Sequence, residues 1–120
     1  MKFRPTSVVA AAAVAATLMA PAWAHPRLVA ASPANNGIAT ATPAIALKFS
    51  ERLIPRFSGI AISRAGGAPI GAPKTAMTTD GRTLLAHVSA PLVPGTYTLA
   101  WHAVSVDTHR VGGSYRFTVR

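Results

Sequence analysis

Prolines and glycines recur along most of this chain, and their spacing limits what it can fold into. Eight of the ten prolines and all nine glycines of the 120 residues lie after residue 24. Proline in a helix interior removes a hydrogen bond and clashes with the preceding turn, and no long stretch repeats its apolar positions with a helical period. Residues 68–73 hold Pro69, Gly71 and Pro73, which argues against a helix there. The chain must therefore be built mainly from short extended segments.

Short runs of alternating apolar and polar residues separate these turn residues. Alternation is typical of half-buried strands, and short strands at intervals of about ten residues are typical of an antiparallel sandwich or barrel. We therefore predict an all-β Greek-key sandwich or barrel of about seven short strands in one domain. Its core should hold Trp101, Phe49, Phe117, Tyr97 and the isoleucine and leucine positions. The clearest strands are expected at residues 27–32, 44–50, 58–64, 83–89, 95–104 and 113–119.

The first 24 residues are typical of a targeting segment. Two basic residues precede an uncharged run of Ala, Val and Leu at residues 8–19, and the small residues of an A-x-A cleavage site follow at 22–24. This is the pattern of a secretory signal peptide, and the apolar run is too short to span a bilayer. We expect residues 1–24 to be removed, which makes His25 the first residue. The remaining domain, 25–120, is expected in the periplasm or outside the cell, without membrane insertion.

The inventory of side chains argues against several classes of site. The sequence has no cysteine, which excludes disulfides, thiolate metal sites and cysteine nucleophiles. Its only carboxylates are Glu51, Asp80 and Asp107, which leaves little basis for a calcium cage, a two-metal centre or a glycosidase-type pair. Residues 25–120 carry ten basic and three acidic residues, a net charge of +7, but the basic residues are scattered. A nucleic-acid-binding surface is therefore not expected.

Cleavage before His25 would create two metal donors on one residue. The α-amine and the imidazole can chelate a metal together, and both are available near neutral pH when a metal competes with protons. Nitrogen donors favour Cu(II) among the divalent first-row metals. The next residue, Pro26, has no N–H, so a copper ion on His25 must take its other ligands from elsewhere in the fold. The alternative is that His25 is a frayed terminal residue.

Asp107 and His109 form a second candidate cluster. Residues two apart in an extended segment point to the same side, so the carboxylate and the imidazole are expected to project together. The alternative is a turn-forming aspartate beside an exposed histidine. Glu51 follows an apolar strand and is a weaker candidate, because it is equally typical of a surface carboxylate paired with Arg52 or Arg56.

Several short motifs follow one another in order along residues 25–120. They are the initial His25, SPA at 32–34, LKFSE at 47–51, PGTY at 94–97, Trp101, SVDTH at 105–109 and GSYRF at 113–117. In this order and spacing they resemble the CopC family of periplasmic copper-binding proteins. The resemblance implies a cupredoxin-like, Ig-like Greek-key β-barrel that binds one Cu(II) ion at its N-terminus.

The resemblance also implies a set of ligands. His25 would supply amine and imidazole, His109 a second imidazole and Asp107 a carboxylate oxygen, an arrangement that resembles a histidine brace. Glu51 matches a glutamate in or near that site.

The sequence departs from the family pattern at two points. Thr108 stands where the family has glycine, so a positive φ there would be strained. Some family members have a separate methionine-rich Cu(I) site, which needs several soft donors; Met77 is the only methionine after residue 24, so no such site is expected. His87 and His102 lie within expected strands and are predicted to face solvent rather than bind metal.

The resemblance implies a non-enzymatic carrier or buffer of Cu(II) in copper resistance or copper supply. Its expected partners are a copper-importing inner-membrane protein or another periplasmic copper protein. Two alternatives remain open. A histidine-brace oxidase or monooxygenase-like enzyme would need an open copper position that Asp107 is expected to occupy. A basic surface-interaction module would need clustered rather than scattered positive charge.

Overall fold

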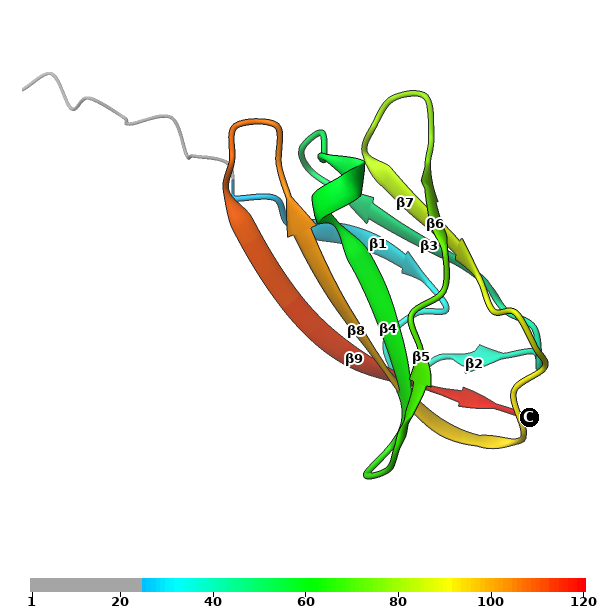
Figure 1. The fold of residues 1–120 in the computed structure, drawn as a ribbon. Coiled ribbons are helices and arrows are strands. Elements are labelled where there is room, and N and C mark those ends of the chain that lie inside the picture. Colours follow the sequence, from blue (N-terminus) through cyan, green and yellow to red (C-terminus); the bar gives the residue numbers. More distant parts are fainter. Residues whose placement is uncertain (1–24) are drawn as a thin grey trace, which may run out of the picture.

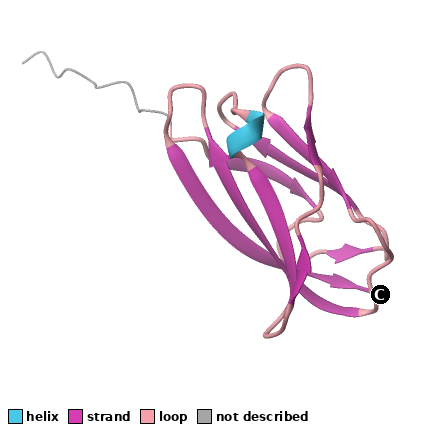
Figure 2. Ribbon diagram, in the orientation of Figure 1, coloured by secondary structure: helices cyan, strands magenta, loops and turns pink. Residues whose placement is uncertain are grey.

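Residues 25–120, the part of the chain that this computed structural model describes, fold into nine strands and one short 3-10 helix joined by loops (Figure 1, Figure 2). The signal peptide predicted at residues 1–24 lies outside the described residues. Within residues 25–120, no helix is long and apolar enough to cross a membrane. The elements are β1 (Leu28–Ser32), β2 (Ile38–Ala39), β3 (Ala44–Phe49), η1 (Pro55–Phe57), β4 (Gly59–Arg64), β5 (Pro69–Gly71), β6 (Thr75–Met77), β7 (Thr83–His87), β8 (Gly95–Val104) and β9 (Arg110–Val119).

The strands form two sheets that pack face to face. One sheet has four strands in the order β1, β3, β7, β6, and the other has five in the order β2, β9, β8, β4, β5. All neighbouring strands are antiparallel except β2, which runs parallel to β9. Consecutive strands often lie in different sheets, so the chain crosses repeatedly between the layers. The predicted all-β sandwich is confirmed.

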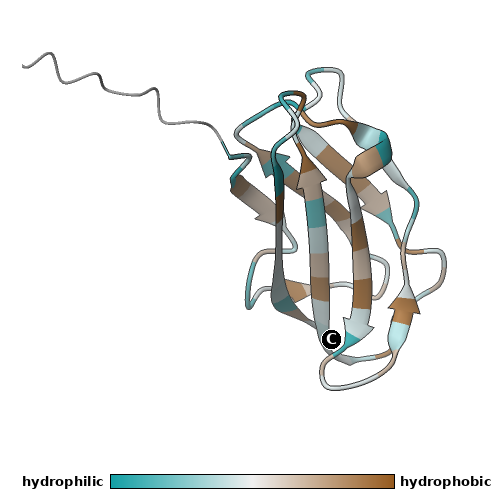
Figure 3. Cartoon of the chain, turned by 60° about the vertical axis from the view of Figure 1, so that its left-hand side comes forward, coloured by the Kyte–Doolittle hydropathy of each residue, from teal (hydrophilic) through white to brown (hydrophobic). Residues whose placement is uncertain are grey.

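The inward-facing side chains of both sheets form the core. Ile45, Leu47 and Phe49 of β3 and Tyr97 and Leu99 of β8 are each at most 1% exposed. Figure 3 shows the corresponding pattern, in which brown bands recur along the strands with paler bands between them. Burying each such side chain contributes roughly 1.5–3 kcal/mol, so these alternating positions hold the sandwich together.

Trp101 differs from the prediction, because it lies at the margin of the core and is only partly buried. Its ring packs edge-on against Phe49, with ring centroids 5.1 Å apart. On its other side the ring covers Gly113 of the neighbouring strand, where an added Cβ would lie 2.7 Å from the indole. The absence of a side chain at Gly113 therefore lets the tryptophan lie across β9.

Strand limits also differ from the sequence prediction. β9 begins at Arg110, three residues early, because it pairs with β8 along its full length. β7 ends at His87, two residues early. The short strands β2, β5 and β6 were not predicted, because two or three residues are too few to show an alternation. Residues 68–73 contain β5 and no helix, as expected.

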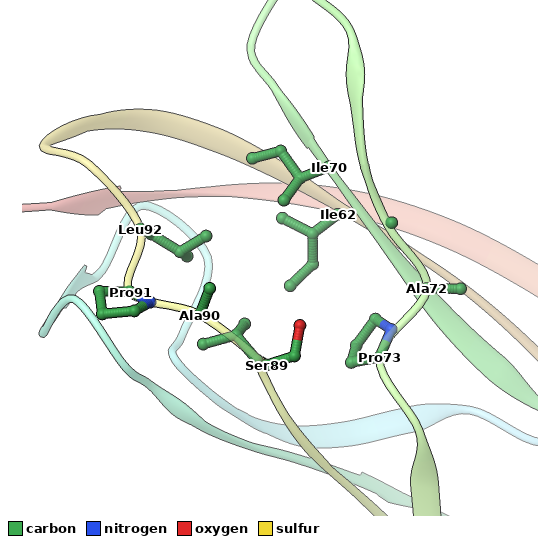
Figure 4. A pocket seen from close by; sticks show the side chains of 10 residues that line it. Ile62, Ile70, Ala72, Pro73, Ser89, Ala90, Pro91 and Leu92 are labelled. Atoms are coloured by element: carbon green, nitrogen blue, oxygen red, sulfur yellow. The ribbon is translucent and has the colours of Figure 1, made fainter.

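The two ends of the sandwich are built from different loops. The β8–β9 turn, the β6–β7 loop and the segment around η1 all lie at one end (Figure 1). The ring contact between His25 and His109 places the start of the described chain at the same end. Toward the other end, a pocket of about 190 Å³, lined mostly by residues with apolar side chains, opens between β4, the β5–β6 connection and residues 88–92 (Figure 4). The residues proposed above as ligands all belong to the first end.

Candidate metal centre

The residues that follow His25 anchor the start of the domain. Pro26 is fully buried. Arg27 donates its backbone N–H to Ser50 Oγ, and Ser50 donates its own backbone N–H to the Arg27 carbonyl oxygen, both over 2.9 Å. These contacts extend the pairing of β1 with β3 to Arg27, the residue directly after Pro26. His25 is exposed immediately beyond this anchor, so its position is set by the fold.

The segment that follows β3 joins the start of the domain to the β8–β9 turn. Leu53 is buried and forms an isolated antiparallel bridge with Ser105. Val106 donates its backbone N–H to the Arg52 carbonyl oxygen over 2.9 Å. Because residue 50 is tied to residue 27 and residues 52–53 are tied to residues 105–106, one segment holds both candidate loops at the same end.

The β8–β9 turn contains the strained position that the sequence predicts. The Thr108 N–H donates to the Ser105 carbonyl oxygen over 2.8 Å, and the Ser105 N–H donates to the His109 carbonyl oxygen over 3.0 Å. Residues 106–108 thus form a three-residue hairpin loop whose last member is left-handed, with Thr108 at φ 74°. Glycine is the residue usually found at this position, and a β-branched side chain is strained there.

The turn places Asp107 and His109 against each other. Nδ1 of His109 lies 3.2 Å from Oδ2 of Asp107, which is ion-pair distance when the imidazole is protonated. Nδ1 is enclosed by the protein, but its contact with that carboxylate oxygen falls short of full hydrogen-bond geometry. The proximity of Asp107 and His109 was predicted, but the predicted reason, an extended segment, is wrong: a turn with a left-handed residue brings the two side chains together.

A hydrogen bond from Ser105 holds the Asp107 carboxylate in place. Ser105 is 1% exposed, and its hydroxyl donates to Oδ1 of Asp107. The hydrogen bond from Ser105, followed by the contact with His109, holds the pKa of the Asp107 carboxyl below its usual value. Asp107 is therefore negatively charged throughout the neutral range, as a metal-binding carboxylate must be.

The rings of His25 and His109 lie side by side. Their centroids are 5.1 Å apart and their planes are nearly perpendicular, at 84°. The fold thus brings together His25, from the start of the domain, and the Asp107–His109 pair, from the β8–β9 turn.

Glu51 does not join these contacts. It is half-buried, and within residues 25–120 it forms no ion pair with Arg52, Arg56 or any other residue. No group of three or more His, Cys, Asp or Glu side chains in this part of the chain is arranged to hold a metal ion. The side chains of His25, His109 and Asp107 thus form successive pairs rather than a closed cage.

The other two histidines are exposed, as predicted. His87 ends β7 and pairs with Ala44, at the far end from the β8–β9 turn. His102 lies on the outer face of β8, with its ring over Gly59. Neither contacts the His25–His109 pair.

Comparison with known proteins identifies the chain at the level of its family. A sequence profile described as the CopC domain matches residues 28–120. The chain belongs to the CopC family. Among relatives of this CopC chain, Copper resistance protein C of Xanthomonas campestris pv. juglandis is 37% identical over 124 residues, which cover 98% of each chain. Protein YobA of Escherichia coli K12 is 41% identical over 100 residues, which cover 82% of this chain and 81% of YobA.

Solved structures agree with the CopC assignment. The crystal structure of CopC from Methylosinus trichosporium OB3b matches with a TM-score of 0.69 and 33% identity, over 79% of this chain and 93% of that one. PcoC from Escherichia coli, described as a methionine-rich copper resistance protein, matches with a TM-score of 0.68 and 38% identity, over 81% of this chain and all of PcoC. The resemblance to CopC drawn from the sequence is confirmed.

Sequence reasoning missed two contributors to this end of the CopC domain. Ser105 was recognised as part of a motif but given no role, although a serine two residues before an aspartate in a turn can hydrogen-bond to it. The Arg27–Ser50 pairing was also missed. The sequence held one signal for this pairing: Ser50 stands at the end of an expected strand, and Arg27 stands at the beginning of another.

Proposed function

We propose that this chain carries one Cu(II) ion per molecule as its cargo. His25 supplies its α-amine and imidazole after removal of residues 1–24, His109 supplies a second imidazole, and Asp107 supplies a carboxylate oxygen. Glu51 is proposed only as an accessory ligand or neighbour. The observation that carries the proposal is the close approach of the His25 and His109 rings, 5.1 Å between centroids, beside an ionised Asp107.

The donor set suits Cu(II). An amine and two imidazoles are nitrogen donors, which Cu(II) binds more strongly than the other divalent first-row metals. Nδ1 of His109 faces Asp107, which leaves Nε2 as the nitrogen for the metal. A carboxylate beside the second nitrogen orients a ligating imidazole. A metal on Nε2 lies on the opposite side of the ring from this contact, so Asp107 becomes a ligand by turning Oδ2 from Nδ1 to the metal, while Oδ1 keeps its hydrogen bond from Ser105.

The cleaved chain has one donor that the side chains alone do not provide. The α-amine of His25 exists only when His25 is the first residue. This explains why the side chains form pairs without a closed cage: the proposed site is completed by the amine. Pro26 is buried and has no N–H, so the ion remains confined to the first residue and the turn.

We propose a role as a periplasmic carrier or buffer in copper resistance or copper supply. Three relatives are named Copper resistance protein C, which supports the role without establishing it for this chain. The proposed partners are a copper-importing inner-membrane protein or another periplasmic copper protein. We also propose that the chain is not an enzyme, because Asp107 takes a copper position that oxygen chemistry would need.

No Cu(I) site of the soft-donor kind is proposed. PcoC is described as methionine-rich, whereas this sequence has one methionine after residue 24. That residue, Met77, is half-buried and packs against the core. A single thioether is a poor basis for selecting Cu(I), which prefers several soft ligands.

Single histidine replacements test the ligand assignment. Competition with a copper chelator would measure the Cu(II) affinity of the chain that begins at His25, with quenching of Trp101, its only tryptophan, as a second signal. His109→Ala should weaken binding strongly and change the copper spectrum. His87→Ala and His102→Ala are matched controls, because both residues are exposed and neither is a proposed ligand. If either control weakened binding as much as His109→Ala, the assignment would be wrong.

A further inference from the structure

A cationic groove lies beside the β8–β9 turn, on the outer face of the five-stranded sheet. It has a volume of about 410 Å³ and is lined by Arg56 and Phe57 of η1, His102 and Val104 of β8, and Arg110 of β9. Figure 1 shows η1 next to the ends of β4 and β8, at the same end as the turn. We propose that this groove docks an acidic segment of a partner protein.

The groove is built by a short helix fastened onto β8. The Ser58 hydroxyl donates to the Ile54 carbonyl oxygen over 2.9 Å and accepts the Val104 N–H over 3.1 Å. Because Ser58 is itself buried, these bonds hold η1 firmly against the sheet. Phe57 nevertheless remains 45% exposed, which is a large exposure for an aromatic side chain in a fixed helix.

Two glycines leave His102 uncovered. Gly59 and Gly112 are its partners on the two neighbouring strands. An added Cβ at Gly59 would lie 2.8 Å from the His102 ring, so the ring lies across β4 where that side chain is missing. The His102 imidazole therefore lies flat on the surface of the groove, where it is accessible and can donate a hydrogen bond.

The charges in the groove are all of one sign. Neither Arg56 nor Arg110 forms an ion pair within residues 25–120, and none of the carboxylates there lines the groove. The Arg56 guanidinium lies 4.8 Å from the centre of the Phe57 ring, which supports it in an exposed position. Guanidinium groups bind carboxylates through paired hydrogen bonds, and arginine with an aromatic residue is a frequent combination at the centre of protein interfaces. A carboxylate-rich segment with an apolar side chain for Phe57 complements this surface.

The groove adjoins the proposed copper site. Arg110 follows His109 directly, and Val104 precedes Ser105, so a segment docked there would lie next to the metal-bearing turn. The idea that such a partner exchanges copper rests on the proposed function. The docking itself does not, since none of the groove residues is a proposed ligand.

Fluorescence anisotropy with a labelled peptide of aspartates, glutamates and one central phenylalanine tests the proposal. The double variant Arg56→Gln/Arg110→Gln should weaken peptide binding about tenfold or more, because two charge-assisted contacts are lost. Arg116→Gln/Arg120→Gln is the matched control. It removes the same charge from exposed positions outside the groove, and it should change binding by less than about twofold, as expected for a screened charge at a distance.

The copper site provides an independent readout. Arg56→Gln/Arg110→Gln should keep the Cu(II) affinity of the unaltered chain, and His109→Ala should keep its affinity for the peptide, so failure of either proposal can be recognised separately. Equal weakening of peptide binding by both arginine pairs would overturn the docking site, because attraction would then follow net charge alone. The same conclusion would follow from an absence of peptide binding, or from an oligonucleotide of equal charge binding the groove more tightly than the peptide.

Discussion

Replacing Thr108 with glycine should stabilise the protein. Thr108 has a φ of 74° in the β8–β9 turn. The left-handed conformation costs an L-residue about 1–2 kcal/mol, and glycine avoids that cost. The greater freedom of glycine in the unfolded chain offsets about 0.4–1 kcal/mol. The hydrogen bond from the Thr108 hydroxyl to the Asp107 carbonyl oxygen is exposed, so water largely replaces it.

The net gain is therefore roughly 0.5–1 kcal/mol, which corresponds to a rise in Tm of about 2–6 °C for a domain of this size. Thermal unfolding of the metal-free chain, followed by circular dichroism, would measure it. Thr118→Gly is the matched control, because Thr118 lies in β9 with an extended backbone and pairs with Thr96. Glycine there should lower Tm. If Thr108→Gly lowered Tm as much as Thr118→Gly, the account of a strained turn would be refuted.

Three further outcomes follow from the polar groups at the same end of the molecule. The pKa of Asp80 is lowered because its carboxylate accepts hydrogen bonds from the Thr78 hydroxyl and the Arg82 N–H. The ionised carboxylate therefore stabilises the fold fully at pH values above the pKa of unfolded aspartate, about 3.9. This stabilisation is lost as the pH falls through the lower pKa of the folded state. Asp80→Asn should therefore lower Tm near neutral pH, and this loss should shrink as the pH falls below about 3.9. An equal loss of Tm at neutral and acidic pH in calorimetry would contradict this. Ser105→Ala should raise the pKa of Asp107, because the largest cause of its depression is removed; an NMR titration of the carboxyl that shows no upward shift would exclude this role for the hydroxyl. Copper binding should weaken from about pH 7 to about pH 5, since protons compete for the amine and imidazoles, and an unchanged apparent affinity in chelator competition would argue against nitrogen ligands.

The strands with large inward side chains could be predicted closely from the sequence. β3, β4 and β8 begin and end within one residue of expectation, because large apolar residues such as Leu47, Ile60 and Leu99 alternate with small or polar neighbours and are almost fully buried. β2 could not be predicted in this way. Its two residues are strand only because Ile38 pairs with Thr118, and a partner so distant in the sequence leaves no local pattern.

The candidate site was predictable in part. Asp107 and His109 were expected to lie together, and they do, although a turn rather than an extended segment brings them there. The approach of the His25 ring to His109 depends on hydrogen bonds through the segment after β3, which no local motif encodes. The resemblance to CopC supplied that pairing, and the ligand roles of these residues remain predictions.

The Cu(II) affinity of two chains that differ only at the N-terminus tests the central claim most directly. One chain begins at His25, and the other carries a single glycine before it, which converts the His25 amine into an amide while leaving every side chain in place. Competition with a chelator should show that the chain beginning at His25 binds one Cu(II) ion tightly and that the added glycine removes most of this affinity. Equal affinity of the two chains would contradict the account, because copper would then be bound without the N-terminal amine.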